Sequence, residues 1–285
     1  MKDRKRVIKE KNTYRPYHII IILFLFLSVF SAAMMYPIVW MICTSFKSNA
    51  EIHMNKTQFF PTEWTLEGYR TAMEKAPIGN WLFNSIFITV VVTVIVILTS
   101  TFIGYVFGKY EFKLKKPLFM LLLATMMVPS QVTMIPRYMM IMKMGLLNKM
   151  AALIVPSMVS TFSIYLAKQF IEDIPDSLCE AAKIDGAGPV GIYWHVILPN
   201  LKPAIGSIGI FTAMAHWNDY LNPLLMLNDV EKMTLPLGLV YFSSQRSEDL
   251  AATMAVATMI MVPMIIIFLL FQRQFIKGLA LSGMK

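Results

Sequence analysis

Hydrophobic residues along this chain gather in six long stretches separated by polar segments. They cover residues 19–43, 81–108, 117–136, 150–171, 203–227 and 250–271. A helix needs about 20 largely apolar residues to cross a membrane. Only helices and closed barrels satisfy the backbone in lipid. The pattern therefore predicts an all-α polytopic membrane protein, with six transmembrane helices in one domain over residues 19–272.

The most distinctive polar segment is a loop over residues 172–202, between the fourth and fifth stretches. Within it, residues 180–199 read E-A-A-K-I-D-G-A-G-P-V-G-I-Y-W-H-V-I-L-P. The two adjacent alanines favour a short helix, and Gly186 is a natural stop for it. Pro189 suits the first turn of a second short helix. The loop is therefore predicted to expose two short helices joined by a turn, a shape suited to docking.

The fifth stretch has a polar centre, A-H-W-N-D-Y-L-N, over residues 215–222. Ionisable and amide groups inside a span are costly and usually face the protein interior or a wet path. Spacings of three and four place His216, Asp219 and Tyr220 on one helical face. Because carboxylates and amides bind hydroxyls and aromatic rings cover the apolar face of a sugar, the patch is a candidate substrate path. Its residues are His216, Trp217, Asn218, Asp219, Tyr220 and Asn222.

A structural role is the alternative for the same patch. Asp219 would then hold spans together, for example by pairing with Arg137 at the end of the third stretch. Gln131, in the third stretch, is a further candidate for the substrate path. Its alternative role is a helix–helix hydrogen bond.

The composition agrees with a membrane protein. The 285 residues are 56% hydrophobic and 15% charged, whereas soluble domains average about 45–50% apolar and about 25% charged. Too little chain remains outside the stretches for a separate catalytic domain. The scattered histidines suggest no metal site, and Cys43 and Cys179, on opposite sides of the predicted membrane, suggest no disulfide. Gly104 and Gly108 form a G-x-x-x-G face for close helix packing rather than a nucleotide-binding loop.

Positive charge predicts the orientation of the chain. Of the 26 Lys and Arg residues, 17 lie in or beside the N-terminal tail 1–18, the loops after the second and fourth stretches, and the C-terminal tail 273–285. Cytoplasmic segments carry an excess of Lys and Arg, so both termini and the 172–202 loop are predicted to be cytoplasmic. The net charge of +9 then follows from topology and requires no nucleic acid. Anionic lipid could also attract the basic N-terminal run.

The 172–202 loop resembles the EAA loop of ABC importer permeases, E-A-A-x-x-x-G-x(9)-[I/V]-x-L-P, with valine at the position where isoleucine is usual. The segments M-V-P-S-Q-V-T-M-I-P, W-N-D-Y-L-N-P-L and F-Q-R-Q-F-I-K-G-L are similar to the maltose-type sugar permease family. The likeness is to the shorter, six-span subunit and covers nearly the whole chain. By this resemblance, the residues that couple the permease to its ATPase are Glu180, Ala181, Ala182, Asp185, Gly186, Leu198 and Pro199.

The resemblance implies a permease that imports a mono- or oligosaccharide and is not itself an enzyme. It implies a heterodimer with a second, related permease, two copies of a cytoplasmic ATPase that binds ATP and Mg, and an extracellular sugar-binding protein received by the outer loops. No cofactor is expected in this chain. The protein is expected to cross the cell membrane of a bacterium or archaeon several times.

The sequence leaves other interpretations open. An ABC permease for a solute other than a sugar has the same architecture. A secondary transporter is also helical, but it usually has about ten to twelve spans and inverted repeats, and neither is visible in the sequence. A membrane-embedded enzyme needs a denser cluster of catalytic groups than the single polar patch supplies.

Overall fold

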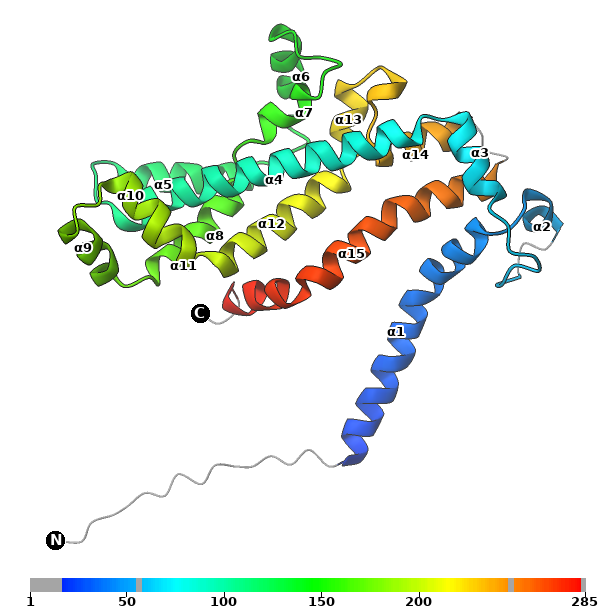
Figure 1. Ribbon diagram of the computed structural model, residues 1–285, viewed down its shortest axis with the longest axis horizontal. Helices are drawn as coiled ribbons and strands as arrows, with labels where there is room; N and C mark the ends of the chain where they lie inside the picture. Colours follow the sequence, from blue (N-terminus) through cyan, green and yellow to red (C-terminus); the bar gives the residue numbers. More distant parts are fainter. Residues whose placement is uncertain (1–16, 55–57, 246–248, 283–285) are drawn as a thin grey trace.

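The computed structural model describes residues 17–54, 58–245 and 249–282, which form helices and connecting segments without a β-strand (Figure 1). The longer helices are α1 (Tyr17–Ser45), α3 (Glu67–Lys75), α4 (Ile78–Lys109), α5 (Lys115–Ala124), α6 (Met134–Lys143), α8 (Thr161–Glu172), α9 (Asp176–Ile184), α12 (Lys202–Trp217), α14 (Leu235–Gln245) and α15 (Leu250–Ser282). The shorter ones are α2 (Asn49–Met54), η1 (Thr125–Met127), α7 (Ala151–Ile154), η2 (Val155–Ser157), α10 (Pro189–Ile192), η3 (Tyr193–Ile197), α11 (Leu198–Asn200), α13 (Leu221–Met226) and η4 (Val230–Lys232). The predicted all-α fold is confirmed. The predicted N-terminal tail, residues 1–18, lies almost entirely outside the described part.

The body of the protein is a bundle built around α4. This helix packs against α8 and α12, and α12 packs in turn against α15. Figure 1 shows α9, α10 and α11 at one end of the bundle, with α2, α3 and α14 at the other. The last turns of α15 lie toward the end that holds α9. The 172–202 loop is therefore held at one end of the long helices, and α2 and α3, which lie between α1 and α4 in the chain, are held at the other end.

Close packing of α4 on α8 depends on two glycines, as the G-x-x-x-G spacing predicts. A Cβ atom on Gly104 would lie 2.9 Å from the Ala167 Cβ atom, and one on Gly108 would lie 2.8 Å from the Ile171 Cγ2 atom. Neither distance is tolerated between carbon atoms, so any larger residue would push the helices apart. The glycine face brings the cytoplasmic-predicted end of α4 against the helix that leads into the 172–202 loop.

Three helices in the described residues are long and apolar enough to cross a membrane: Tyr17–Ser45, Ile78–Lys109 and Leu250–Leu269. Two further pairs qualify if each bent pair is one span. They are Ala151–Ser157 with Thr161–Glu172, bent by 41°, and Pro189–Asn200 with Lys202–Trp217, bent by 80°. The structure therefore supports a multi-pass membrane protein with three to five recognisable spans, and the count of six stays a prediction.

Two of the predicted spans are interrupted. In the stretch 117–136, η1 ends at Met127 and α6 begins only at Met134, with Pro129 in the turn between them. In the stretch 203–227, α12 ends at Trp217 and α13 begins at Leu221. Irregular backbone at membrane depth is tolerated only where protein buries it or a cavity lies beside it. Both breaks are therefore expected to be buried in protein or to lie beside a cavity.

The first helix stands largely apart from the bundle. In Figure 1, α1 meets the other helices near α2 and then diverges from them. Only Cys43, Thr44 and Ser45 at its C-terminal end are buried. An apolar helix of this length exposed along most of its surface requires lipid or another apolar chain around it.

Candidate functional site

The first half of the 172–202 loop folds as a helix with a glycine-dependent end. Gly186 has φ of +86°, in the left-handed region that glycine adopts without strain. The Gly186 N–H donates to the Lys183 carbonyl at 3.0 Å, and the Ala187 N–H donates to the Ala182 carbonyl at 2.9 Å. This pair of bonds is the Schellman arrangement that ends a helix. The predicted stop of α9 at Gly186 is confirmed.

The second half of the loop begins as predicted and then departs from a simple helix. Pro189 occupies the first turn of α10, where its missing N–H costs nothing. The five residues after α10, Tyr193–Ile197, form the π-helix η3. This form occurs mostly as single turns within helices. The pattern residues Leu198 and Pro199 follow in α11. Pro189 predicted where this segment begins, but nothing in the sequence predicted the π-helix η3.

The predicted coupling residues lie on α9, in the turn after it and on α11, at one end of the bundle (Figure 1). Exposed residues are Glu180, Ala181, Asp185, Gly186 and Pro199, and half-buried ones are Ala182 and Leu198. Apolar side chains that the motif does not include lie beside them. Ile184 is 87% exposed, Val190 60% and Trp194 49%. Large apolar residues exposed within a polar loop are typical of a surface that contacts another protein or a membrane. The signal in the sequence is their place inside an otherwise hydrophilic segment.

The inner side of the loop is fixed to α4 by tyrosine hydroxyls. The Tyr193 hydroxyl shares a hydrogen bond of 2.8 Å with the Thr101 hydroxyl. The Tyr105 hydroxyl donates to the Pro189 carbonyl at 3.2 Å and lies 2.8 Å from the Tyr110 hydroxyl. The Tyr105 and Tyr193 rings are both buried, with centroids 5.8 Å apart. These contacts hold the inner side of the loop against α4.

An ion pair makes a second connection between α4 and the loop. Lys109 Nζ, at the last residue of α4, donates to Asp176 Oδ1 at 2.6 Å and also to the Ile174 carbonyl. The hydrogen bond from Lys109, and then its charge, hold the pKa of Asp176 below the usual value. Asp176 is also in the first turn of α9, where a negative charge favours the helix.

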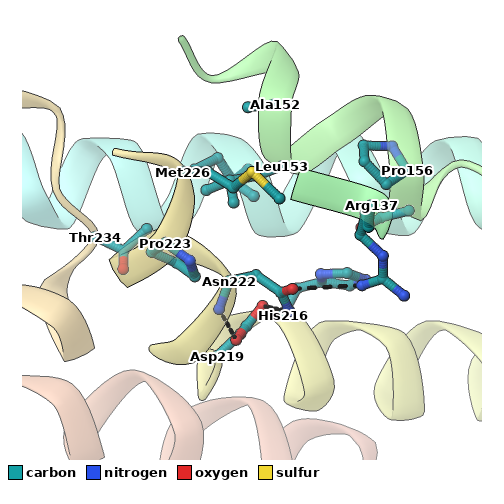
Figure 2. A pocket seen from close by; sticks show the side chains of 12 residues that line it. Arg137, Ala152, Leu153, Pro156, His216, Asp219, Asn222, Pro223, Met226 and Thr234 are labelled. Atoms are coloured by element: carbon teal, nitrogen blue, oxygen red, sulfur yellow. Dashed lines mark hydrogen bonds between the residues drawn. The ribbon is translucent and has the colours of Figure 1, made fainter. Parts of the chain in front are cut away.

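The polar patch at the end of α12 forms a hydrogen-bonded chain of three side chains (Figure 2). Arg137 Nη1, from α6, donates to Asn222 Oδ1 at 3.3 Å. Asn222 Nδ2 in turn donates to Asp219 Oδ2 at 2.7 Å. Arg137 and Asp219 are therefore linked through the Asn222 amide, and no direct ion pair joins them in this part of the structure. The patch ties α6 to α13.

The expectation of one continuous helical face is wrong, because α12 ends before Asp219. The Asp219 carboxylate instead accepts the backbone N–H of Asn222 at 3.1 Å, which favours a new turn over continuation of the helix. His216, Asp219 and Asn222 nevertheless line one cavity with Arg137, of about 20 Å³. A cavity of that size accommodates about one water molecule, so a sugar does not fit in it here.

The other predicted path residues lie elsewhere. Trp217 is buried, and its Nε1 donates to the Ile260 carbonyl at 3.0 Å, which fixes α12 to α15. Asn218 is exposed and donates to the Met214 carbonyl of its own helix at 2.9 Å. Tyr220 and Gln131 are exposed. Of the predicted residues, the structure thus brings together His216, Asp219 and Asn222.

Comparison with known proteins finds related sequences along most of the chain. Residues 100–280 match the family model described as "Binding-protein-dependent transport system inner membrane component". The arabinooligosaccharides transport system permease protein AraQ of Halalkalibacterium halodurans is 31% identical over 88% of this chain and 91% of its own length. The melibiose/raffinose/stachyose import permease protein MelC of Bacillus subtilis is 30% identical over 93% of this chain and 96% of its own length.

A solved structure shares the fold. A chain of a bacterial ABC transporter involved in the import of the acidic polysaccharide alginate superposes with a TM-score of 0.81 at 24% identity. The match covers 90% of this chain and 95% of that one. The overall helical fold is therefore found in an experimentally determined structure.

Proposed function

We propose that this chain, which belongs to the family of inner membrane components of binding-protein-dependent transport systems, is the permease subunit of an ATP-driven sugar importer. The family makes it a transport component of the membrane rather than an enzyme. The observation that carries the sugar assignment is its relation, over nearly its whole length, to permeases named for oligosaccharides. The proposed cargo is a mono- or oligosaccharide.

In this proposal other chains supply the energy. Two copies of a cytoplasmic ATPase bind ATP and Mg, a second related permease completes the channel, and an extracellular sugar-binding protein delivers the cargo. The exposed side of α1 is available for the second permease and for lipid. In the assembly, this chain contributes part of the path for the sugar and the helices whose movement opens and closes that path.

The 172–202 loop is the proposed contact with the ATPase. Its exposed Glu180 and Ile184 offer charge and apolar area, while its inner side is bonded to α4 through Tyr193 and Tyr105. ATP-driven closure of the ATPase pair would then push α9, and the buried tyrosines would pass that displacement to α4. The permease would then have two conformations, and ATP on the ATPase and sugar delivered by the binding protein would shift the equilibrium between them.

The proposed orientation places the loop and both termini in the cytoplasm. The end of α15 lies toward the end of the bundle that holds α9 (Figure 1), which is consistent with one side for both. The excess of Lys and Arg in these segments supports a cytoplasmic location for that side.

Uptake into proteoliposomes tests the cargo class. The chain is reconstituted with its partner permease, the ATPase pair and the binding protein, and screened with arabinotriose, raffinose, stachyose and maltotriose alongside an amino acid and a dipeptide. Uptake of at least one sugar and of neither peptide-type solute is expected. Uptake of the amino acid or dipeptide without any sugar would contradict the sugar assignment.

A further inference from the structure

A second hollow in the bundle lies beside the polar patch and is large enough for more than water. Its volume is about 270 Å³. It lies where the bent pair η2–α8 meets the end of α12, with Val96 of α4 also in its lining. Ser157 and His216 line both this hollow and the small cavity beside Arg137. The two spaces are therefore neighbours along one side of α12.

The lining is rich in hydroxyl groups for a membrane bundle. Its polar residues are Ser157, Ser160, Ser163, Thr212 and His216. Ser160 Oγ accepts the Ser163 N–H at 3.3 Å and the Ser163 hydroxyl at 3.0 Å. Because both of these bonds use Ser160 as acceptor, its own hydroxyl proton remains available to donate to a molecule in the hollow.

An aromatic pair adds an apolar wall. Phe162 of α8 and Phe211 of α12 line the hollow and pack edge to face, with ring centroids 5.6 Å apart and planes at 88°. Phe162 and Ala215 are exposed, so the hollow is open on one side. A concave space with apolar rings and a few convergent polar groups is the usual form of a small-molecule site.

Broken helices mark the same place. The backbone between η2 and α8 is irregular at Met158 and Val159, and α12 stops just beyond His216. One carbonyl freed by the first break, that of Met158, accepts the Thr99 hydroxyl of α4 at 2.8 Å. Discontinuous spans whose half-helix ends meet at a cavity are typical of substrate sites in transporters. A substrate site at this place would explain both the breaks in the helices and the hollow between them.

We propose that the hollow lined by Ser157, Ser160, Ser163, Phe162, Phe211 and His216 is a binding site in this subunit for an uncharged glycosyl unit of the transported sugar. The proposal rests on the proposed function. Hydroxyls and one imidazole pair with sugar hydroxyls, and the two rings cover its C–H surface. The lining contains no Lys, Arg, Asp or Glu, so a uronate, whose carboxylate needs a cationic partner once desolvated, is excluded from it.

Cysteine protection tests the site in the complete transporter. Both native cysteines are free and buried and are replaced in a Cys43→Ala, Cys179→Ala background. Ala215→Cys then reports on the hollow, and Ala124→Cys, exposed on α5 and outside the lining, is the matched control. Labelling by an uncharged methanethiosulfonate is measured during turnover, with the neutral sugar that the wild-type complex takes up among arabinotriose, raffinose, stachyose and maltotriose.

Near saturation, at about ten times the dissociation constant, that sugar should slow labelling of Ala215→Cys about tenfold and leave Ala124→Cys unchanged. Trigalacturonate should protect neither. Equal labelling of Ala215→Cys with and without a transported sugar would overturn the site while leaving the proposed function intact. A wild-type complex that takes up no sugar would instead overturn both.

A filling variant supplies a second readout. Ala215→Phe adds a ring to the hollow without removing a hydrogen bond. We expect sugar uptake to fall about tenfold or more while ATPase stimulation by the binding protein persists, since the loop is untouched; the control Ala124→Phe should transport normally. Wild-type uptake in a folded Ala215→Phe complex would contradict the proposal.

Discussion

The buried hydroxyls of Tyr193 and Thr101 lie 2.8 Å apart, one on the 172–202 loop and the other on α4. Thr101 also donates within its own helix to the Ile97 carbonyl at 2.7 Å, so its hydroxyl is held in place from the α4 side. Tyr193 then brings η3 to a fixed point on that helix. If the loop receives motion from an ATPase, this contact is one of the points at which the motion enters the bundle, with the Tyr105–Pro189 and Lys109–Asp176 contacts.

Tyr193→Phe tests this contact, because it removes the hydroxyl and keeps the ring. We expect a loss of about 1 kcal/mol in stability and a fall in the number of sugars transported per ATP hydrolysed. The measurement is the ratio of uptake to ATPase rate in proteoliposomes. Tyr165→Phe, on the exposed side of α8, is the control. An unchanged ratio in Tyr193→Phe would limit this tyrosine to a structural role.

Glu180→Arg tests the exposed side of the loop. Because Glu180 is exposed on α9 and has no bonded partner in the described structure, its replacement should leave insertion and folding intact. Reversal of its charge should abolish sugar uptake by weakening contact with the ATPase. Asp173→Arg, exposed just before α9 and outside the E-A-A motif, should retain most uptake. Wild-type uptake in Glu180→Arg would count against the coupling role.

Gly186→Ala tests whether the turn depends on glycine. There is open space around a Cβ atom at this position, so the whole cost comes from its φ of +86° and should be about 1–2 kcal/mol. Gly188→Ala is a matched control, since its surroundings are equally open and its φ of −71° suits alanine. Thermal unfolding of the purified complex should separate the two variants. Equal melting temperatures would contradict the left-handed turn.

The Lys109–Asp176 pair predicts a dependence of loop stability on pH. The pKa of Asp176 in the folded protein lies below its ordinary value of 3.8. Its contribution is therefore complete above that ordinary value and is lost as the pH falls through the lower, folded pKa. Asp176→Asn should lower the melting temperature slightly at pH 7 and match wild type under acid conditions. Because Asp176 is 78% exposed on its side chain, salt should weaken the difference. A difference that persisted in acid would contradict the pairing.

Local signals allowed much of the 172–202 loop to be predicted. The helix over α9, its stop at Gly186 and the new start at Pro189 each depend on residues within a few positions of one another. The all-α fold likewise follows from apolar stretches that membranes admit only as helices or barrels. The close packing at Gly104 and Gly108 could also be predicted, because it depends only on the spacing of the two glycines.

Tertiary contacts set what could not be predicted. Trp217 is in the polar W-N-D-Y segment, yet its indole N–H finds the Ile260 carbonyl 43 residues away. The serines of the hollow come from the η2–α8 bend, whose direction relative to α12 no single stretch encodes. Likewise, Asn222 intervenes between Arg137 and Asp219 because α12 breaks first, and helical spacing alone predicted no break.

The central claim is that this chain moves a sugar with energy taken from an ATPase on other chains. The most direct measurement is uptake of radiolabelled raffinose, or of the sugar found by the uptake screen, into proteoliposomes that contain the full assembly. Uptake is predicted to require the binding protein, internal ATP and hydrolysis-competent ATPase subunits, and to stop with a hydrolysis-deficient pair. Uptake that continues without the ATPase, driven by an imposed proton or sodium gradient, would contradict the claim.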